Sequence, residues 1–410
     1  MKNKRIYLAS PHMGGLEEAF VKEAFDTNWI APLGPNVNEF ENEVSSYVAS
    51  KGGAVAMVSG TSAIHMALKA LGIKEGDKVF CSSLTFAASC NPIIYEKAIP
   101  VFIDSEKESF NMSPVALKKA FEACIREDEE RDWTEEVSLT LKDKKKATLD
   151  FRQKSSLPKA VIVVHLYGQS ANMDEICEIC EYYGVPIIED AAESLGGTYK
   201  GKQTGTIGEF GIYSFNGNKI ITTSGGGMLV GHDTKALEKT KFWITQAREN
   251  ERYYEHKELG FNYRMSNIVA GIGRGQLRVL DERIAKKKEI FEIYKEAFKG
   301  IKDIEIAPIC DYGKPNYWLS VITLKKESKV KPIDIILALE KENIEARHIW
   351  KPMHIQPFYK DYEFFSHNGD KDEISVSEDI FNRGLCLPSD TKMTEEDIER
   401  VIYIIKSLFI

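Results

Sequence analysis

The sequence predicts an α/β fold, in which a large domain with a mostly parallel sheet is followed by a smaller α+β domain. Two patterns support this prediction. Short apolar segments of strand character alternate with amphipathic segments through the first two-thirds of the chain, and the pattern changes near residue 268. Continuous apolar strands between helices are typical of a parallel sheet covered on both faces. A length of 410 residues also favours two domains, which we place at 1–267 and 268–410.

The elements of the first domain follow from the spacing of apolar residues. In the segment 36–52, Val37, Phe40, Val44 and Val48 recur at helical spacing, so this segment predicts the first helix. Two further amphipathic segments, 62–73 and 173–184, also predict helices. The apolar runs that predict strands are 54–59, 78–83, 100–104, 159–166 and 186–190.

A charged stretch at about 126–155 separates a predicted helix from the next strand. It mixes both signs of charge and has few large apolar residues, so we interpret it as a solvated insertion without a chemical role. The second domain begins with a helical pattern at about 268–301, which predicts one long helix or two joined helices. Strands are expected at 316–324 and 344–350, and a capping-box pattern at Thr394–Asp397 precedes a final amphipathic helix.

The composition excludes several classes of protein. Apolar residues make up 43% and charged residues 28% of the chain, as in soluble globular proteins. A formal net charge of −8 argues against nucleic-acid binding, and no apolar run approaches the roughly 20 residues that span a membrane. The N-terminus lacks the apolar core of a signal peptide. Seven scattered cysteines fit a reducing cytoplasm without disulfides.

Cys177 and Cys180 form a CxxC pattern, which can indicate metal or redox chemistry. No second CxxC or His pair completes a zinc site, and both cysteines fall on the apolar side of a predicted helix. We therefore interpret them as buried packing residues and predict no metal.

The most informative residue is Lys219. It lies among small and apolar residues, and no carboxylate occurs between Glu209 and His232. Burial disfavours the ammonium form of a lysine, and a neutral amine is the nucleophile that a Schiff base requires. Asp190 ends the predicted strand 186–190. A nucleophilic lysine and a buried aspartate are what a pyridoxal phosphate site needs, although a lysine in a Gly-rich hairpin would have the same local sequence.

Ligands in parallel sheets bind at the carboxyl ends of the strands. Here the strand ends offer Gly60, Thr61 and Ser62 at a helix start that suits a phosphate, and Phe86 as a flat aromatic ring. His165 follows another strand and is a candidate substrate contact. Each signal alone also fits an ordinary helix cap, a core phenylalanine or a core histidine. The sequence has no Walker loop, no GxGxxG after a strand and no HExxH.

Several motifs in this order resemble the DegT/StrS-type nucleotide-sugar aminotransferases. They are SGTSAIHMAL, LTFAAS, IIEDAAES, YSFNGNK followed by SGGG, and GFNYRMSN, and the resemblance covers essentially the whole chain apart from the stretch at about 126–155. The segments SPHMGG (10–15) and NWIAPLGPNV (28–37) look most like enzymes that aminate UDP-4-keto-6-deoxy-N-acetylglucosamine in bacillosamine-type pathways. His12 and Trp29, within these two segments, are candidate substrate contacts.

The resemblance implies the aspartate-aminotransferase fold (fold type I), pyridoxal 5'-phosphate as cofactor and a homodimer with shared sites. Lys219 would carry the cofactor, and Asp190 would pair with its ring nitrogen. The residues implied around the ring and phosphate are Phe86, Ala192, Gly60, Thr61, Ser62, Ser214 and, from the partner subunit, Asn262. Glu193, near the ring hydroxyl, departs from the commoner Gln or His. The segment RHIWKPMH matches a substrate loop and adds Arg347, Trp350, Lys351 and His354 as candidate contacts, although Arg347 and Lys351 also fit an ordinary surface.

The implied reaction moves the amino group of L-glutamate to C4 of a UDP-linked 4-keto-6-deoxy-N-acetylhexosamine, for surface glycan synthesis. The same fold would serve a dTDP- or GDP-linked keto-sugar. A sugar dehydratase, a non-catalytic regulator and a nicotinamide oxidoreductase would share parts of the same pattern. Lys219 and the scattered cysteines argue against the dehydratases, which replace the lysine with histidine or use an iron–sulfur cluster. The absent glycine fingerprint argues against the oxidoreductase.

Overall fold

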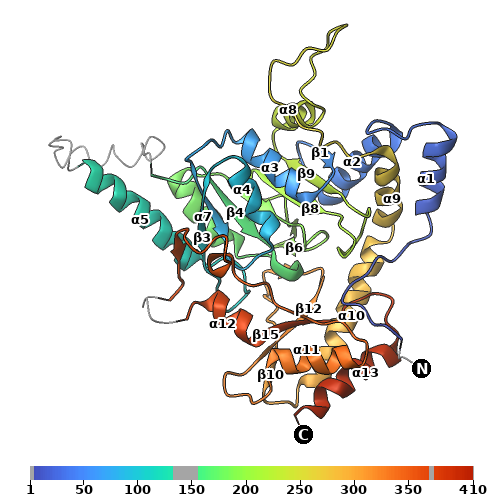
Figure 1. Cartoon of the computed structure of the whole chain (residues 1–410), viewed down its shortest axis with the longest axis vertical. Coiled ribbons are helices and arrows are strands. Elements are labelled where there is room, and N and C mark those ends of the chain that lie inside the picture. The colour runs from blue at the N-terminus through green and yellow to red at the C-terminus, as the bar shows by residue number, and fades with distance from the viewer. Residues whose placement is uncertain (1–3, 133–155, 369–373, 410) are drawn as a thin grey trace.

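A computed structural model describes residues 4–132, 156–368 and 374–409 of the chain (Figure 1). Its centre is an eight-stranded sheet in the order β1-β9-β8-β5-β4-β2-β3-β14. The bounds are β1 Ala54–Met57, β9 Gly227–Gly231, β8 Phe210–Ser214, β5 Ile187–Asp190, β4 Ala160–Val164, β2 Lys78–Ser82, β3 Ile99–Ile103 and β14 Phe364–Phe365. The six strands β8, β5, β4, β2, β3 and β14 are parallel to one another. Strand β9 lies between β8 and β1 and is antiparallel to both. The mostly parallel sheet is thus confirmed.

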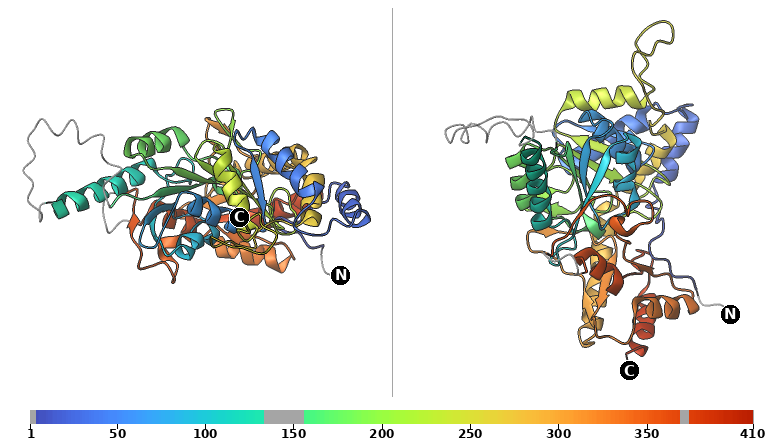
Figure 2. Two further views of the ribbon diagram at one scale, coloured as in Figure 1. Left: turned by 90° about the horizontal axis from the view of Figure 1, so that it is seen from above. Right: turned by 60° about the vertical axis from the view of Figure 1, so that its left-hand side comes forward.

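Alternate residues along the strands pack on opposite faces of this sheet, as the two-residue repeat of a strand requires. On β2, Phe80 faces one apolar core, whereas Val79 and Cys81 face another. The first core includes α5 (Pro114–Asp132) and α7 (Met173–Tyr183), and the second includes α3 (Gly60–Ala70), α4 (Asn91–Tyr95) and α8 (Thr234–Ile244). Both faces of the sheet are covered by helices (Figure 2).

Three helices form a further layer beside β1. They are α1 (Glu17–Asp26), α2 (Pro35–Val48) and α9 (Asn267–Leu277), and α9 packs on both of the others. Glycines allow this close approach, because a Cβ at Gly273 would lie 2.5 Å from the Phe40 ring. A second helix, α10 (Leu280–Phe298), continues from α9 into the smaller domain, so the helical pattern at about 268–301 resolves into two helices.

The smaller domain contains an antiparallel sheet in the order β10-β12-β15-β13. Its strands are β10 Ile304–Ile306, β12 Ser320–Leu324, β15 Gly384–Leu387 and β13 Arg347–His348, and its helices are α11 Pro332–Lys341, α12 Val376–Arg383 and α13 Glu395–Ser407. Thr394 and Asp397 form the predicted capping box of α13. A third, three-stranded sheet joins β11 (Gly313–Lys314), β6 (Thr198–Tyr199) and β7 (Lys202–Gln203).

The structure changes four details of the predicted organisation. Helix α1 was not predicted, since no side chain caps its start. The first charged residues of the proposed insertion, up to Asp132, continue helix α5, and the rest of that stretch lies outside the described residues. Strand β14, although beyond residue 268, pairs with β3 of the large sheet. Ile6 packs in the smaller domain and bridges to Ile344. No helix among the described residues is long and apolar enough to cross a membrane.

Candidate active site

The candidate site is a cavity of about 370 Å³ at the carboxyl ends of the parallel strands. The loops that follow β1, β2, β5 and β8 supply most of its wall, and the smaller domain supplies Trp318 and Trp350. Among the residues predicted from the sequence, it brings together Gly60, Thr61, Phe86, Asp190, Ala192, Glu193, Ser214, Lys219 and Trp350. The expectation that the strand ends converge on one site is consistent with this geometry.

Lys219 lies in the loop between β8 and β9, with 12% of its side chain exposed. Its Nζ is 4.2 Å from the centre of the Trp318 ring and 3.7 Å from Glu193 Oε1. The sequence suggested a lysine without a carboxylate nearby, and the structure corrects this. Glu193 comes from a different strand end, so the local sequence around the lysine could not show it.

Asp190 ends β5 and is 5% exposed. Ser89 Oγ donates a hydrogen bond of 2.6 Å to one carboxylate oxygen, and the Ala192 N–H donates one of 3.1 Å to the other. Ser89 is in turn 2.7 Å from the Thr85 hydroxyl. These contacts fix the orientation of a buried carboxylate. Ser89 was not predicted as a site residue, although it ends the LTFAAS motif that supplies Phe86.

The start of α3 forms the candidate phosphate site, but the structure changes the role of one predicted residue. Ser62 N–H donates to Ser59 Oγ at 3.1 Å, and Ser62 Oγ accepts from the Ser59 N–H at 3.2 Å. This capping box already uses both polar groups of Ser62. Gly60, Thr61 and Ser214 line the cavity instead. Their position at the positive end of a helix suits an anion.

A glycine beside this helix start allows two chain segments to pass closely. A Cβ at Gly227 would lie 2.3 Å from the backbone of Ser59. Gly227 therefore permits close passage of the backbone at the start of α3.

Two side chains of the cavity, Phe86 and Ala192, could lie against a planar ring. Phe86 is 54% exposed, an unusual exposure for a large aromatic residue, and Ala192 lines the same cavity. Phe86 also contacts Trp350, with 5.4 Å between ring centres. An exposed aromatic face in a cavity can stack on a planar ligand.

Glu193 is buried on the side of the cavity that faces the smaller domain. Its Oε2 accepts a hydrogen bond of 2.7 Å from the Tyr167 N–H, and its Oε1 accepts one of 3.2 Å from the Trp350 indole. Burial raises the pKa of Glu193, and this effect outweighs the opposing charge of Lys219 and these two hydrogen bonds.

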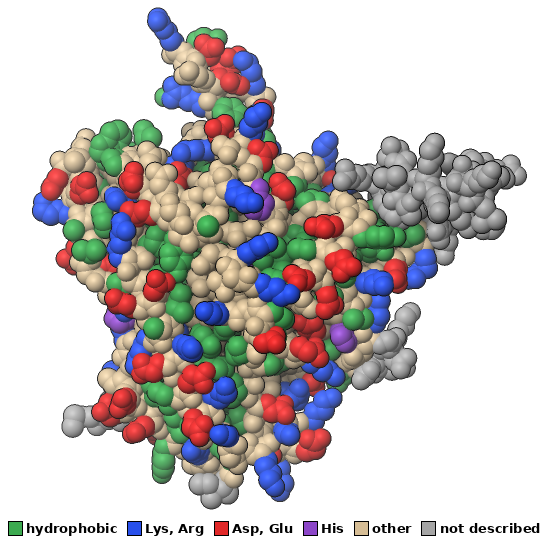
Figure 3. All heavy atoms as spheres, turned by 180° about the vertical axis from the view of Figure 1, so that it is seen from behind, with side chains coloured by type: hydrophobic (Ala, Val, Ile, Leu, Met, Phe, Trp, Pro, Cys, Tyr) green, Lys and Arg blue, Asp and Glu red, His purple; other side chains and the backbone are tan. Residues whose placement is uncertain are grey.

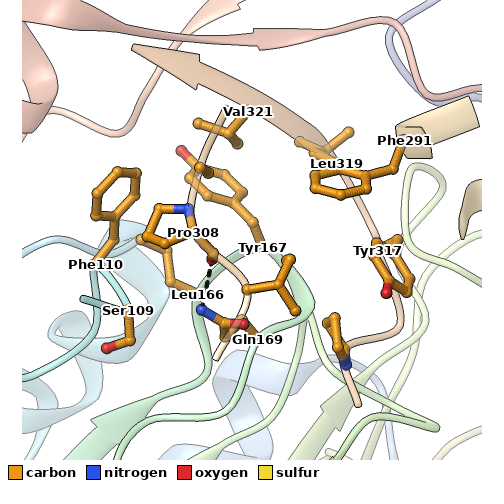
Figure 4. Close-up of a pocket in the computed structure, with 13 residues that line it drawn as sticks. Ser109, Phe110, Leu166, Tyr167, Gln169, Phe291, Pro308, Tyr317, Leu319 and Val321 are labelled. Atoms are coloured by element: carbon orange, nitrogen blue, oxygen red, sulfur yellow. Dashed lines mark hydrogen bonds between the residues drawn. The ribbon is translucent and has the colours of Figure 1, made fainter. Parts of the chain in front are cut away.

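Tyr167 has an uncommon backbone conformation and connects the cavity to the boundary between the domains. Its φ is 52°, and the Trp350 N–H donates to its hydroxyl at 3.0 Å. Behind it is a second, mostly apolar cavity of about 30 Å³ (Figure 4). All three aromatic residues with a left-handed backbone in the described chain, Phe110, Tyr167 and Tyr317, line that cavity. Surrounding packing must hold such residues in place, because the conformation is strained.

Most candidate substrate residues lie outside the main cavity. His12 lines a separate recess of about 10 Å³ that also includes Lys219, and its Nδ1 is 2.8 Å from the Thr391 hydroxyl. Trp29 is 42% exposed on the connection between α1 and α2. Arg347 and Lys351 are exposed, and Arg347 forms an ion pair of 2.8 Å with Glu345.

The other two candidate substrate histidines have structural partners. His165 is fully buried, where its Nε2–H donates to Glu189 at 2.8 Å and its Nδ1 accepts from the Ala171 N–H at 3.1 Å. Both ring nitrogens are therefore occupied, and the prediction of a substrate contact is corrected. His354 stacks on Phe364 with 3.6 Å between ring centres, and its Nδ1 is 2.6 Å from the Ser83 hydroxyl.

The remaining predicted residue, Asn262, is exposed and forms a strand-like bridge with Thr245. It lies beside a projecting arm, residues 248–260, which extends beyond α8 (Figure 1). Within the chain described, it does not line the main cavity. A partner subunit would be needed to bring it to a cavity of this kind.

Two further observations concern surface charge and possible metal ligands. Lysines, arginines and acidic residues are intermixed over the face in Figure 3, without a large basic patch. Among residues 4–132, 156–368 and 374–409, no group of three or more His, Cys, Asp or Glu side chains could hold a metal ion. Cys180 is buried as predicted, whereas Cys177 is partly exposed.

The cavity suits pyridoxal phosphate in size and in the order of its groups. Gly60, Thr61 and Ser214 could hold the phosphate, Phe86 could stack on the ring, and Asp190 could pair with the ring nitrogen. Lys219 lies within the same cavity and could bind the aldehyde. When bound, the cofactor would supply an electron sink for the bond changes at the substrate carbon.

Comparisons with known proteins agree with this geometry. The sequence profile of the DegT/DnrJ/EryC1/StrS aminotransferase family matches residues 11–406. One relative, from Bacillus subtilis (strain 168), is named "Putative pyridoxal phosphate-dependent aminotransferase EpsN". It is 52% identical over 407 residues, covering 99% of this chain and 96% of that protein. A GDP-perosamine synthase from Caulobacter vibrioides is 34% identical, with 97% and 96% covered.

The fold is also found among solved structures. A DegT DnrJ EryC1 StrS aminotransferase from Brucella abortus has a TM-score of 0.81 and 26% identity, and the match covers 96% of this chain and 95% of that one. The predicted fold type, aminotransferase class and pyridoxal phosphate cofactor are thus confirmed. The chain belongs to the DegT/DnrJ/EryC1/StrS aminotransferase family.

Proposed function

We propose that this aminotransferase moves the amino group of L-glutamate to C4 of a UDP-linked 4-keto-6-deoxy-N-acetylhexosamine. The products are a UDP-4-amino-4,6-dideoxy sugar and 2-oxoglutarate, and the amino sugar would serve surface glycan synthesis. The observation that carries the proposal is the placement of Lys219, Asp190 and Phe86 around one cavity at a helix start. In this cavity a lysine can bind a carbonyl covalently while an aspartate holds the ring.

The residues of this chain would act in two half-reactions. Lys219 would hold the cofactor and, as a free amine, would accept a proton from the Cα of the amino acid and pass it on. Asp190, fixed by Ser89 and Ala192, would pair with the ring nitrogen and favour its protonated form. The keto-sugar then enters the same cavity, and Lys219 moves the proton in the opposite direction. One product leaves before the second substrate binds, so the kinetics are ping-pong.

The UDP-sugar substrate rests on the N-terminal segments 10–15 and 28–37 and on one relative. A UDP-4-amino-4,6-dideoxy-N-acetyl-beta-L-altrosamine transaminase from Campylobacter jejuni is 31% identical and covers 80% of this chain. A GDP-linked keto-sugar is the second candidate, because a relative of 34% identity is a GDP-perosamine synthase. The bacillosamine-type sugar and a cytoplasmic location are part of the same proposal.

We also propose a homodimer with shared sites. The projecting arm carries Tyr253, Tyr254 and Leu259, which are 63%, 78% and 73% exposed. Large apolar side chains gathered on one extended arm favour contact with a second protein surface. In a dimer, this arm and Asn262 would reach the partner's cavity, and Trp29 would be covered.

A spectroscopic assay tests the function. The purified protein should absorb visible light, and borohydride should fix the cofactor to Lys219, which peptide mapping would detect. L-Glutamate should bleach the band, and UDP-4-keto-6-deoxy-N-acetylglucosamine should restore it. Restoration by a GDP-linked keto-sugar alone would select the second candidate. A protein that stays colourless with added pyridoxal phosphate would overturn the assignment of Lys219.

A further inference from the structure

We propose that Glu193 takes up the proton that Lys219 must lose before it acts as a nucleophile, so that the buried pair contains a carboxylic acid and an amine. This inference rests on the proposed role of Lys219. It adds a second proton-carrying group to the site and connects that group to the smaller domain.

Geometry places the two groups within reach of each other. Glu193 Oε1 is 3.7 Å from Lys219 Nζ, and both side chains are shielded, with 5% and 12% exposed. A proton passes directly at hydrogen-bond distance, about 1 Å shorter, and the flexible lysine stem can close that gap. Lys219 Nζ and Glu193 Oε1 then exchange one proton: the N–H bond breaks as the O–H bond forms. The pair is neutral before and after the transfer.

The surroundings of the pair act on its two forms, the ion pair and the neutral pair, in opposite directions. Low polarity favours the neutral acid and amine, because two charges cost more to bury. The Trp318 ring, 4.2 Å from Nζ, favours the ammonium ion instead. The N–H groups of Tyr167 and Trp350 favour the carboxylate. In the proposed balance, the low polarity of the site outweighs these contacts, so Glu193 holds the proton.

Other ionisable groups around Glu193 do not replace Lys219 as its partner. Asp190 is the other carboxylate that acts on Glu193, and its negative charge raises the pKa of Glu193 further. Tyr167 and Cys386 face Glu193 from the η3 turn (Leu166–Gly168) and from β15. Burial raises the pKa of Cys386 to about 12 and raises the pKa of Tyr167 well above its usual range, so both are neutral near pH 7.

Two segments of the smaller domain hold Glu193. The Trp350 indole binds its carboxylate, and Asn316 Nδ2 donates to its backbone carbonyl at 2.9 Å. Asn316 Oδ1 also accepts from the N–H of Trp318, the residue whose ring contacts Lys219. A shift of this domain would therefore alter the donors of Glu193 and the ring beside Lys219 together.

Infrared spectroscopy on the full-length protein, freed of its cofactor, gives a direct test. The difference spectrum of wild type minus Glu193→Gln at pH 7 should contain the C=O band of a neutral carboxylic acid. Glu209→Gln, which replaces an exposed carboxylate, is the control and should show carboxylate bands alone. Other buried acids such as Glu106 cancel in the difference. Carboxylate bands alone at Glu193 would overturn the proposal.

A second variant covers the case in which Glu193→Gln does not fold. Lys219→Met removes the cation, so Glu193 should be neutral there. Equal acid bands in wild type and Lys219→Met support the proposal, whereas a band gained only in Lys219→Met shows that Glu193 is ionised beside the lysine.

The labelling rate of Lys219 by a small amine reagent, measured by peptide mapping, supplies an independent readout. A shared proton makes the amine fraction independent of pH over a wide range. The wild-type rate should therefore change little between pH 6 and 8, while that of Glu193→Gln should fall about tenfold per pH unit below its midpoint. A wild-type rate that falls as steeply would contradict the proton transfer. Neither test involves a sugar, so a wrong substrate would leave both results unchanged.

Discussion

The two walls of the cavity are built in different ways. On the large-domain wall, polar groups are fixed by contacts among the loops of that domain, such as the Ser59–Ser62 box and the hydrogen bonds from Ser89 and Ala192 to Asp190. On the other wall, Trp318 and Trp350 are placed by hydrogen bonds to Asn218 and Glu193, which are 100 and 157 residues away in the chain. The first wall is therefore organised by its own loops, and the second depends on how the domains meet. Substitutions on the two walls should have different consequences.

The largest effect is expected at Lys219, where the walls meet. Lys219→Ala removes both the covalent attachment and the proton carrier, so kcat should fall by about 10³-fold or more. Single-turnover measurements with glutamate would show whether the first half-reaction is lost. Lys202→Ala, at an exposed lysine on β7, is the matched control and should keep full activity. Loss of activity without loss of the borohydride-stable label would assign attachment to another lysine.

The next effect concerns the stability of the second wall. Lys287 is buried, and its Nζ donates to the carbonyls of Trp318 and Ser389 at 2.9 and 2.8 Å. Burial lowers the pKa of Lys287 from 10.5 to about 8. Between pH 8 and 10.5, Lys287 is protonated in the unfolded chain but neutral in the folded protein. The free energy of unfolding therefore rises as the pH rises from 8 to 10.5. The gain should be on the order of 3 kcal/mol.

Denaturant unfolding at several pH values checks this prediction. The difference in unfolding free energy between wild type and Lys287→Met should grow in favour of wild type from pH 8 to 10.5, and should be flat below pH 7. Lys286→Met, at the partly exposed neighbouring position, is the control. A difference that is constant with pH would show that Lys287 titrates normally.

A smaller effect is expected on the first wall. Asp190→Asn keeps the shape but removes the charge that would hold the ring nitrogen protonated. Charged buried hydrogen bonds contribute about 2 kcal/mol, so pyridoxal phosphate should bind roughly 30-fold more weakly. Titration of the cofactor into the apoprotein measures this, and Asp361→Asn, at an exposed aspartate, is the control. Unchanged affinity in Asp190→Asn would mean that another residue pairs with the ring.

The contrast between the walls also explains how much the sequence could predict. Strand ends are visible as apolar runs, and parallel strands bring their ends together, so Thr61, Phe86 and Asp190 could be placed near one another. The resemblance to a family then supplied Ser214. Local hydrogen bonding was harder to foresee: Ser62 looked available for phosphate, but the capping box uses its polar groups.

On the second wall, Trp350 became a candidate only through the resemblance to a family, and Trp318 was not predicted as a site residue. Trp318 could be assigned only to a strand-like segment, because its contact with Lys219 depends on how two domains pack. His165 looked available at a strand end, yet the buried Glu189 occupies it. Burial raises the pKa of Glu189, but hydrogen bonds from His165 and backbone N–H groups reverse this and lower the pKa overall. Such buried networks follow from tertiary structure rather than from spacing.

The smallest expected effect, that of a substitution at Trp350, tests most directly whether the two walls act independently. Trp350→Phe removes the indole donor to Glu193 but keeps the backbone N–H that donates to the Tyr167 hydroxyl. The unfolding free energy should fall by about 1 kcal/mol, while pyridoxal phosphate affinity should stay unchanged, since Trp350 is not among the residues implied around the ring and phosphate. Trp243→Phe is a matched control, because that indole donates to the exposed Glu258 and should cost less. If Trp350→Phe instead weakened cofactor binding as strongly as Asp190→Asn, the cofactor site would depend on the domain contact, and the two walls would act as one.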